Sequence, residues 1–212
     1  MLPVSRFITF EGIEGSGKSS HARSLAAALR ARGYEVVETR EPGGTPAGTA
    51  IRALLLGAEA TPLTALAELF LYCADRTQHV TETIRPALSA GRVVVCDRFS
   101  DSTIAYQGYG RGLDLDIVQA LDARAREGLE PSLTFLLDCP AEVGLARAKA
   151  RAGAADRFER ETVAFHARVR TGFTTLATQS RGRTIVVDST QAPAVTGKRI
   201  VEVTLERLEA QR

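Results

Sequence analysis

Residues 6–33, RFITFEGIEGSGKSSHARSLAAALRARG, decide the fold of this chain. They open with an apolar run at 6–11 that is rich in Phe and Ile, which is typical of a buried strand. A glycine-rich turn follows, and residues 20–32 then have helical spacing and end before Gly33, a common residue at helix C-termini. The order of strand, glycine-rich turn and helix predicts a phosphate-binding turn.

The turn itself fits the pattern G-x-x-x-x-G-K-[ST]. Its glycines let successive backbone N–H groups point toward one phosphate, and the N-terminus of the helix adds partial positive charge. In this pattern the lysine contacts the terminal phosphates of a nucleoside triphosphate, and the residue after it binds Mg²⁺. The residues predicted to hold the triphosphate are Gly12, Ile13, Glu14, Gly15, Ser16, Gly17, Lys18, Ser19 and Ser20.

Strand-like and helix-like segments alternate along the whole chain. Continuous apolar runs, which suggest strands buried on both faces, occupy residues 6–11, 35–39, 92–96, 133–138 and 184–187. Helical spacing occupies residues 20–32, 63–90 with an interruption near Val80, 114–127, 141–151, 158–179 and 193–211. Loops rich in turn residues are expected at 41–48 and 152–156. This alternation predicts an α/β fold with three layers, α/β/α, around a parallel sheet.

Charge and composition exclude several classes of protein. The chain of 212 residues has 27 basic and 25 acidic residues, so its net charge of +2 argues against a nucleic-acid binder. It has neither a run of about 20 apolar residues that would span a membrane nor a signal-peptide pattern in its first residues. The widely spaced Cys73, Cys96 and Cys139 suggest free thiols. We therefore expect a cytoplasmic protein without nucleic-acid or membrane partners.

Asp97 and Arg98 follow directly after the apolar run at 92–96. An acidic residue at the end of such a strand can serve Mg²⁺ or its water shell. The adjacent arginine points to a second anion, such as the phosphate of an acceptor molecule. An ordinary surface pair of Asp and Arg is the alternative.

A basic cluster surrounds the glycine-containing turn at 152–156. It consists of Arg147, Lys149, Arg151 and Arg157. A helix that ends in basic residues before such a turn suggests a lid over residues 147–158 that closes on phosphates, as phosphoryl transfer requires. The alternative is a solvated basic helix face.

Tyr72 and Arg76 lie four residues apart and so share one face of the predicted helix. The tyrosine ring could stack on a base, and the arginine could hydrogen-bond to the edge of that base. The alternative is core packing with a surface salt bridge.

Taken together, these residues resemble the bacterial thymidylate kinases. The segments that carry the resemblance are FEGIEGSGKSS (10–20), REPGGT (40–45), YCADRTQHV (72–80), DRFSDSTIAYQGYGRG (97–112) and ARAKARAGAADRFE (146–159). The resemblance implies one P-loop kinase domain over 1–212, with the P-loop NTPase fold around a five-stranded parallel sheet. It also implies transfer of the γ-phosphoryl group of ATP to dTMP with Mg²⁺, giving dTDP and ADP, and a homodimer.

The resemblance assigns roles to individual positions. Arg98 and Arg52 would hold the acceptor phosphate, and Tyr72 and Arg76 would stack on thymine and read its edge. The full set that it places around dTMP is Glu14, Pro42, Arg52, Tyr72, Arg76, Arg98, Thr103, Tyr106 and Gln107. The residues expected near Mg²⁺ are Ser19, Asp97 and, as a second candidate, Glu14.

Two positions depart from the family pattern. Tyr72 stands where Phe is usual, and Gly15 stands where some members carry an arginine inside the phosphate-binding turn. The second departure resembles the subgroup whose catalytic arginine comes from the lid. We therefore expect Arg151 to be the main transition-state arginine, with Arg157 assisting and Arg147 over the adenine. The expected catalytic residues are Lys18, Arg98, Arg151 and Arg157.

Two other functions fit the same residues. One is a kinase of the same fold that phosphorylates a different nucleoside monophosphate or a deoxynucleoside. The other is a non-catalytic sensor that binds ATP only as a ligand, against which the intact Arg98 and the lid arginines argue.

Overall fold

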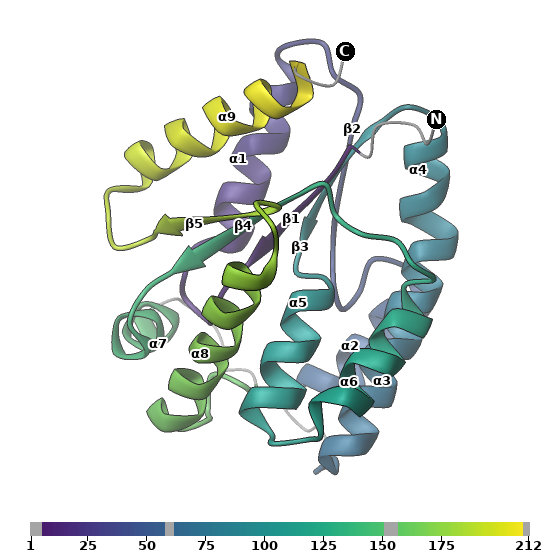
Figure 1. The fold of residues 1–212 in the computed structure, drawn as a ribbon, viewed down its shortest axis with the longest axis vertical. Coiled ribbons are helices and arrows are strands. Elements are labelled where there is room, and N and C mark those ends of the chain that lie inside the picture. Colours follow the sequence, from purple (N-terminus) through teal and green to yellow (C-terminus); the bar gives the residue numbers. More distant parts are fainter. Residues whose placement is uncertain (1–5, 58–61, 151–156, 210–212) are drawn as a thin grey trace.

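Five parallel strands form one sheet with the order β2-β3-β1-β4-β5 in the computed structural model, which describes residues 6–57, 62–150 and 157–209 (Figure 1). The strands are β1 Phe7–Glu11, β2 Val36–Arg40, β3 Val93–Asp97, β4 Leu133–Asp138 and β5 Thr184–Asp188. Each lies within one residue of its predicted position, so the prediction of a five-stranded parallel sheet is confirmed. That residues 1–212 form a single domain stays a prediction.

Burial differs between the centre and the edges of the sheet. The central strands β1, β3 and β4 are almost wholly buried, as their continuous apolar sequences predict. The edge strands β2 and β5 are only partly buried, and Val186 of β5 is 53% exposed. Burial on both faces was therefore a wrong expectation for these two strands, because an edge strand has a neighbour on one side only.

Helices cover both faces of the sheet and give the predicted three layers (Figure 1). On one face, α1 Lys18–Arg30 and α9 Pro193–Glu209 pack Leu25 and Ile200 against Ile8 and Phe135. On the other face, α8 Val163–Gln179 and the π-helical segment η2 Ile104–Gly110 pack against β4. The segment η1 Val80–Ile84, also π-helical, and α4 Arg85–Ser89 pack against β1 and β3.

The remaining helices are α2 Pro46–Leu56, α3 Ala65–His79, α5 Ser100–Thr103, α6 Leu115–Ala125 and α7 Ala141–Ala150. The long helix predicted at 63–90 is interrupted at η1, as expected near Val80. The helix predicted from residue 158 begins only at Val163, because Thr162 caps it by accepting a hydrogen bond from the backbone N–H of Phe165.

The sequence predicted neither α2 nor the helical run from Ser100 to Gly110. Residues 41–48 are predicted to form a loop, but Thr45 is an N-cap and Pro46 occupies the first turn of α2, where proline is tolerated. The second run, SDSTIAYQGYG, is polar and has no helical period of apolar residues. Neither segment therefore shows the pattern by which a helix is recognised.

The carboxyl ends of β1, β2 and β3 meet at one edge of the sheet, where β1 leads into the glycine-rich turn and β3 into Arg98. Ligand sites of open parallel sheets form at this edge. No helix in the described ranges is both long enough and apolar enough to cross a bilayer.

Candidate active site

The glycine-rich turn packs tightly against the start of α7. A Cβ atom on Gly15 would lie 1.9 Å from the backbone oxygen of Gly144, and a Cβ on Gly144 would lie 2.5 Å from the backbone oxygen of Glu14. Gly15 also has a φ of +70°, which L side chains rarely adopt. Close approach and backbone conformation therefore both require glycine at position 15.

Lys18 is buried beneath this turn. Its ammonium group donates to the backbone oxygen of Ile13 at 2.6 Å and to Ser16 Oγ at 3.3 Å. Burial and then repulsion by Arg98 lower the pKa of Lys18 to about 8, although Glu14 and Asp97 oppose the shift. A triphosphate placed in the turn would give this amine a counter-charge.

Ser19 and Asp97 offer oxygen ligands beside the turn. Ser19 Oγ donates to Asp97 Oδ2 at 2.5 Å, and the other carboxylate oxygen, Oδ1, is buried without a hydrogen-bond partner in the part of the chain that is described. A hydroxyl and a carboxylate with an unused oxygen fit the preference of Mg²⁺ for oxygen. Glu14 is the weaker candidate, because both of its oxygens already have donors.

Arg98 stands where β3 ends and has a φ of +72°. This conformation is uncommon for a residue with a side chain and costs about 1–3 kcal/mol where it persists. It lets the guanidinium group reach Gly12 O at 3.0 Å, Ser102 Oγ at 3.1 Å and Glu14 Oε1 at 2.9 Å. The left-handed backbone at Arg98 therefore places its side chain so that it links the end of β3 to the phosphate-binding turn.

Glu14 is held as a carboxylate by several donors. Burial alone would raise its pKa, but Arg98, His166 and Lys18 outweigh burial and lower the pKa to about 2. The Tyr106 hydroxyl donates to both Glu14 oxygens, at 2.7 and 2.6 Å. His166 also contacts Glu14: its Nδ1 lies 3.1 Å from Glu14 Oε2, while its Nε2 contacts the backbone oxygen of Phe158 at 2.9 Å.

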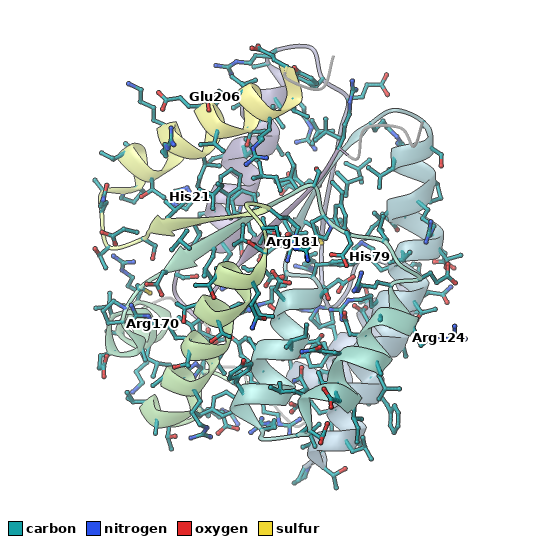
Figure 2. The ribbon with its side chains drawn as sticks, viewed as in Figure 1. His21, His79, Arg124, Arg170, Arg181 and Glu206 are labelled. Atoms are coloured by element: carbon teal, nitrogen blue, oxygen red, sulfur yellow. The ribbon has the colours of Figure 1, made fainter. Side chains whose placement is uncertain are left out.

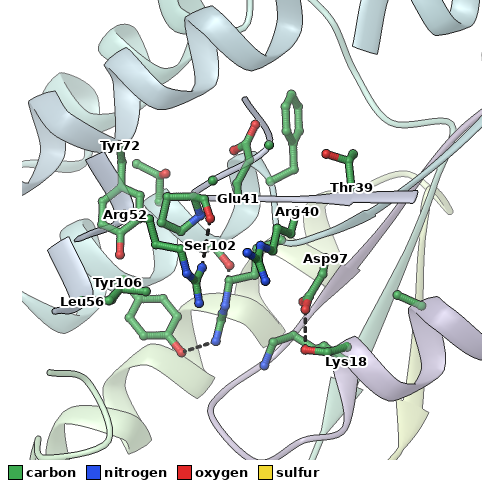
Figure 3. A pocket seen from close by; sticks show the side chains of 18 of the residues that line it. Lys18, Thr39, Arg40, Glu41, Arg52, Leu56, Tyr72, Asp97, Ser102 and Tyr106 are labelled. Atoms are coloured by element: carbon green, nitrogen blue, oxygen red, sulfur yellow. Dashed lines mark hydrogen bonds between the residues drawn. The ribbon is translucent and has the colours of Figure 1, made fainter. Parts of the chain in front are cut away.

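A cavity of about 670 Å³ extends from the phosphate-binding turn to residues of α2, α3 and η2. Figure 3 shows Lys18 and Asp97 at one end and Tyr72 and Leu56 at the other. All nine residues expected around dTMP line this cavity: Glu14, Pro42, Arg52, Tyr72, Arg76, Arg98, Thr103, Tyr106 and Gln107. The structure thus brings together residues from five separate segments, while their individual roles stay predictions.

Arg76 is 1% exposed, although it lines the cavity. It donates to Glu41 and Asp122 at 2.9 and 2.6 Å and to Thr103 Oγ1 at 2.9 Å, and its second terminal nitrogen lies 2.8 Å from Glu41. Burial would lower the pKa of Arg76, but the two carboxylates raise it above its ordinary value. Its charge is therefore balanced inside the protein, which sets it apart from Arg98.

Two of the three arginines of the expected lid, Arg147 and Arg157, lie in the described part of the chain. Arg147 donates to the backbone oxygen of Ser189, in the connection from β5 to α9, at 2.8 Å. Arg157 lies 2.9 Å from Glu68 of α3 and donates to Leu63 O at 3.3 Å, so it faces α3 rather than the phosphate-binding turn. Arg151 lies outside the described residues, as do residues 152–156, so that half of the expected lid is not described.

Several residues of the site escaped the sequence reasoning. Arg40 lines the cavity, and Figure 3 shows it beside Arg52. Glu41 pairs with Arg76 and with His79, which also contacts Thr39 Oγ1 at 2.7 Å. Figure 2 labels His79 among the side chains of the whole molecule. Arg40 and Glu41 stand in the segment REPGGT, so their place in that motif was the available signal.

The comparisons with known proteins agree with this geometry. The model of the family described as thymidylate kinase matches residues 10–200. The chain belongs to the thymidylate kinase family.

Family members of known sequence match most of the chain. The thymidylate kinase of Trichlorobacter lovleyi is 49% identical over 207 residues, which are 95% of this chain and 98% of that protein. The thymidylate kinase of Desulfovibrio desulfuricans is 54% identical over 193 residues, which are 88% of this chain and 89% of that protein. A crystal structure of thymidylate kinase from Ehrlichia chaffeensis has a TM-score of 0.77 at 35% identity, covering 95% of this chain and 98% of that one.

Proposed function

We infer that this chain transfers the γ-phosphoryl group of ATP to dTMP and so forms dTDP and ADP. The observation that carries this inference is one continuous cavity that joins the phosphate-binding turn to Tyr72 and Gln107, in a chain that matches the thymidylate kinase family over residues 10–200. The cavity is large enough for a nucleotide and has cationic side chains at the end that faces the turn.

The reaction needs no strong general base, because the attacking phosphate oxygen of dTMP is already anionic near neutral pH. Catalysis then depends on positioning and on neutralising charge. Lys18 would bind the transferring group, while Arg98 and Arg52 would hold the acceptor phosphate in line. Glu14 fixes the direction of the Arg98 guanidinium through their ion pair of 2.9 Å.

Ser19 and Asp97 would hold Mg²⁺, which supplies neutralisation of charge on the phosphate oxygens of ATP when bound. The unpartnered Asp97 Oδ1 supports this assignment. Replacing Ser19 with Ala should raise the Mg²⁺ concentration needed for half-maximal rate and should weaken binding of Mg²⁺·ATP, measured by calorimetry, more than binding of dTMP.

We assign the main transition-state arginine to Arg151, with Arg147 over the adenine. An assisting role for Arg157 would require this side chain to leave its contact with Glu68 of α3. The absence of an arginine at Gly15 supports a catalytic arginine elsewhere in the chain. Arg151→Ala should lower kcat by orders of magnitude with little change in dTMP affinity. A kcat near that of the unmodified enzyme would contradict this assignment.

A coupled assay of ADP release tests the proposed function directly. The enzyme is given ATP, Mg²⁺ and, separately, dTMP, dUMP, dCMP, UMP or thymidine. We expect dTMP to have the highest kcat/KM. Preference for another acceptor would indicate a different kinase of this fold, and absence of transfer to every acceptor would indicate a sensor of ATP.

We also propose that the enzyme is a homodimer. Large apolar side chains are exposed on the neighbouring helices α2, α3 and α6: Leu54 is 58% exposed, Leu66 46%, Phe70 52% and Ile117 53%. Exposed apolar groups on adjacent elements are typical of a surface that another protein covers. Light scattering after gel filtration should give twice the mass of one chain, and Phe70→Asp should reduce it to one.

A reducing cytoplasm suits the cysteines, since Cys73, Cys96 and Cys139 are all free thiols.

A further inference from the structure

Glu68 of α3 is a fully buried carboxylate, with 0% of the residue exposed. It does not line the cavity, and the mechanism above makes no use of it. Four donor nitrogens from three side chains, Gln107, Arg111 and Arg157, converge on its two oxygens. Such a group is costly to bury unless its partners compensate, and a packed apolar side chain could stabilise the core as well.

The first carboxylate oxygen of Glu68 contacts a residue in the wall of the proposed acceptor pocket. The side-chain amide of Gln107 donates to Glu68 Oε1 at 2.8 Å, so the orientation of that amide is fixed. Gln107 is 1% exposed and lines the cavity. Glu68 therefore determines which side of the Gln107 amide group faces the cavity.

The second carboxylate oxygen of Glu68 contacts the segment that contains Arg157 and Phe158. Glu68 Oε2 lies 2.9 Å from the guanidinium group of Arg157. Arg111 bridges both Glu68 oxygens at 3.2 and 3.3 Å and donates to Glu161 Oε1 at 2.5 Å. The same guanidinium lies 5.3 Å from the centre of the Phe158 ring, which lines the cavity.

We propose that Glu68 is a positioning residue for acceptor binding, which fixes Gln107 and the segment around Phe158 as two walls of one pocket. The proposal rests on the function proposed above, since it takes dTMP as the occupant of that pocket. Glu68 touches neither substrate; it acts through Gln107 and, by way of Arg111 and Arg157, through Phe158.

The test compares Glu68→Gln with Glu161→Gln. Both variants change a carboxylate that contacts Arg111 into an amide of the same size. In Glu68→Gln the new NH₂ group must face an arginine or the Gln107 amide, so one of these contacts is lost in either orientation. In Glu161→Gln the contacts to Gln107 and Arg157 stay intact, which makes it the matched control.

Calorimetric titration with dTMP, and separately with ATP, gives the readout. We expect Glu68→Gln to raise the Kd for dTMP about tenfold, because pocket walls that are no longer held in place must be ordered when dTMP binds. The Kd for ATP should change less than about twofold, and Glu161→Gln should change neither value by more than that. A dTMP affinity within twofold of the unmodified enzyme, or an equal loss in Glu161→Gln, would overturn the proposal.

A double-mutant cycle with Gln107→Leu shows whether Glu68 acts through Gln107. The second substitution should add little once the first is present, whereas additive losses would contradict the proposal. If Glu68→Gln does not fold, Glu68→Asp keeps the charge and should produce a smaller loss of the same kind. If the unmodified enzyme fails to bind dTMP, the proposed function itself has failed; normal binding with an unaffected variant refutes only the role of Glu68.

Discussion

Arg98 and Arg76 border the same cavity and were both expected to bind dTMP, yet their surroundings differ. The side chain of Arg98 is 20% exposed and forms an ion pair with Glu14. The side chain of Arg76 is 1% exposed and lies between two carboxylates, Glu41 and Asp122. The guanidinium group of Arg98 is therefore partly open to a phosphate in the cavity, whereas that of Arg76 is enclosed by two carboxylates. Arginine content alone does not show which of these roles a residue has.

The largest expected effect is on catalysis and concerns Arg98. Arg98→Ala should lower kcat/KM for dTMP about 10³-fold, a loss of about 4 kcal/mol, because a positioned cation is removed from the acceptor phosphate and the transferring group. The coupled ADP assay measures this, with Arg98→Lys as the variant that keeps the charge but loses the planar fork. A loss below tenfold would remove the distinction between the two arginines.

The second prediction is about stability and concerns Arg76, which is enclosed by two carboxylates. Arg76→Met should lower the free energy of unfolding by about 3 kcal/mol, because it leaves Glu41 and Asp122 buried without their counter-ion. Urea denaturation measures this, and Arg98→Met is the control, for which we expect a smaller loss. An equal loss in both variants would show that the two arginines contribute alike to folding.

A third prediction follows from Asp75, next to Arg76. Burial, together with repulsion by Glu41, raises the pKa of Asp75 from 3.8 to about 6. The folded state then holds this proton more tightly than the unfolded state, so stability falls as pH rises between these two values. Relative to Asp75→Asn, the unmodified protein should lose about 2 kcal/mol between about pH 4.5 and about pH 7.5. Parallel pH profiles of the two proteins would contradict the shift.

The smallest effect is expected at the base end of the cavity. Tyr72→Phe restores the usual family residue and keeps the ring, so the Kd for dTMP should change by less than about threefold. Tyr72→Ala removes the stacking surface and should weaken binding at least about tenfold. Calorimetry distinguishes these results, and a large effect of Tyr72→Phe would assign the binding energy to the hydroxyl.

The sequence was most informative where structure depends on neighbouring residues. The phosphate-binding turn could be predicted because its glycines, Lys18 and Ser19 act within one short segment. The ion pair of Arg76 with Asp122 could not be predicted, because Asp122 lies 46 residues away along the chain. The same holds for Arg157, which contacts Glu68 instead of facing the phosphate-binding turn. The left-handed backbone of Arg98 is likewise imposed by the surrounding fold, since nothing in its own sequence favours it.

The contact between Gly15 and Gly144 also has a consequence for the history of this enzyme. An arginine at position 15 would place its Cβ 1.9 Å from the backbone of Gly144, so a single substitution would disrupt the turn before it could contribute to the reaction. Placing a catalytic arginine in the turn, in place of the one proposed at position 151, would require α7 to shift as well. The two placements of such an arginine are thus separated by more than one substitution, so we expect a lineage that adopts one of them to keep it.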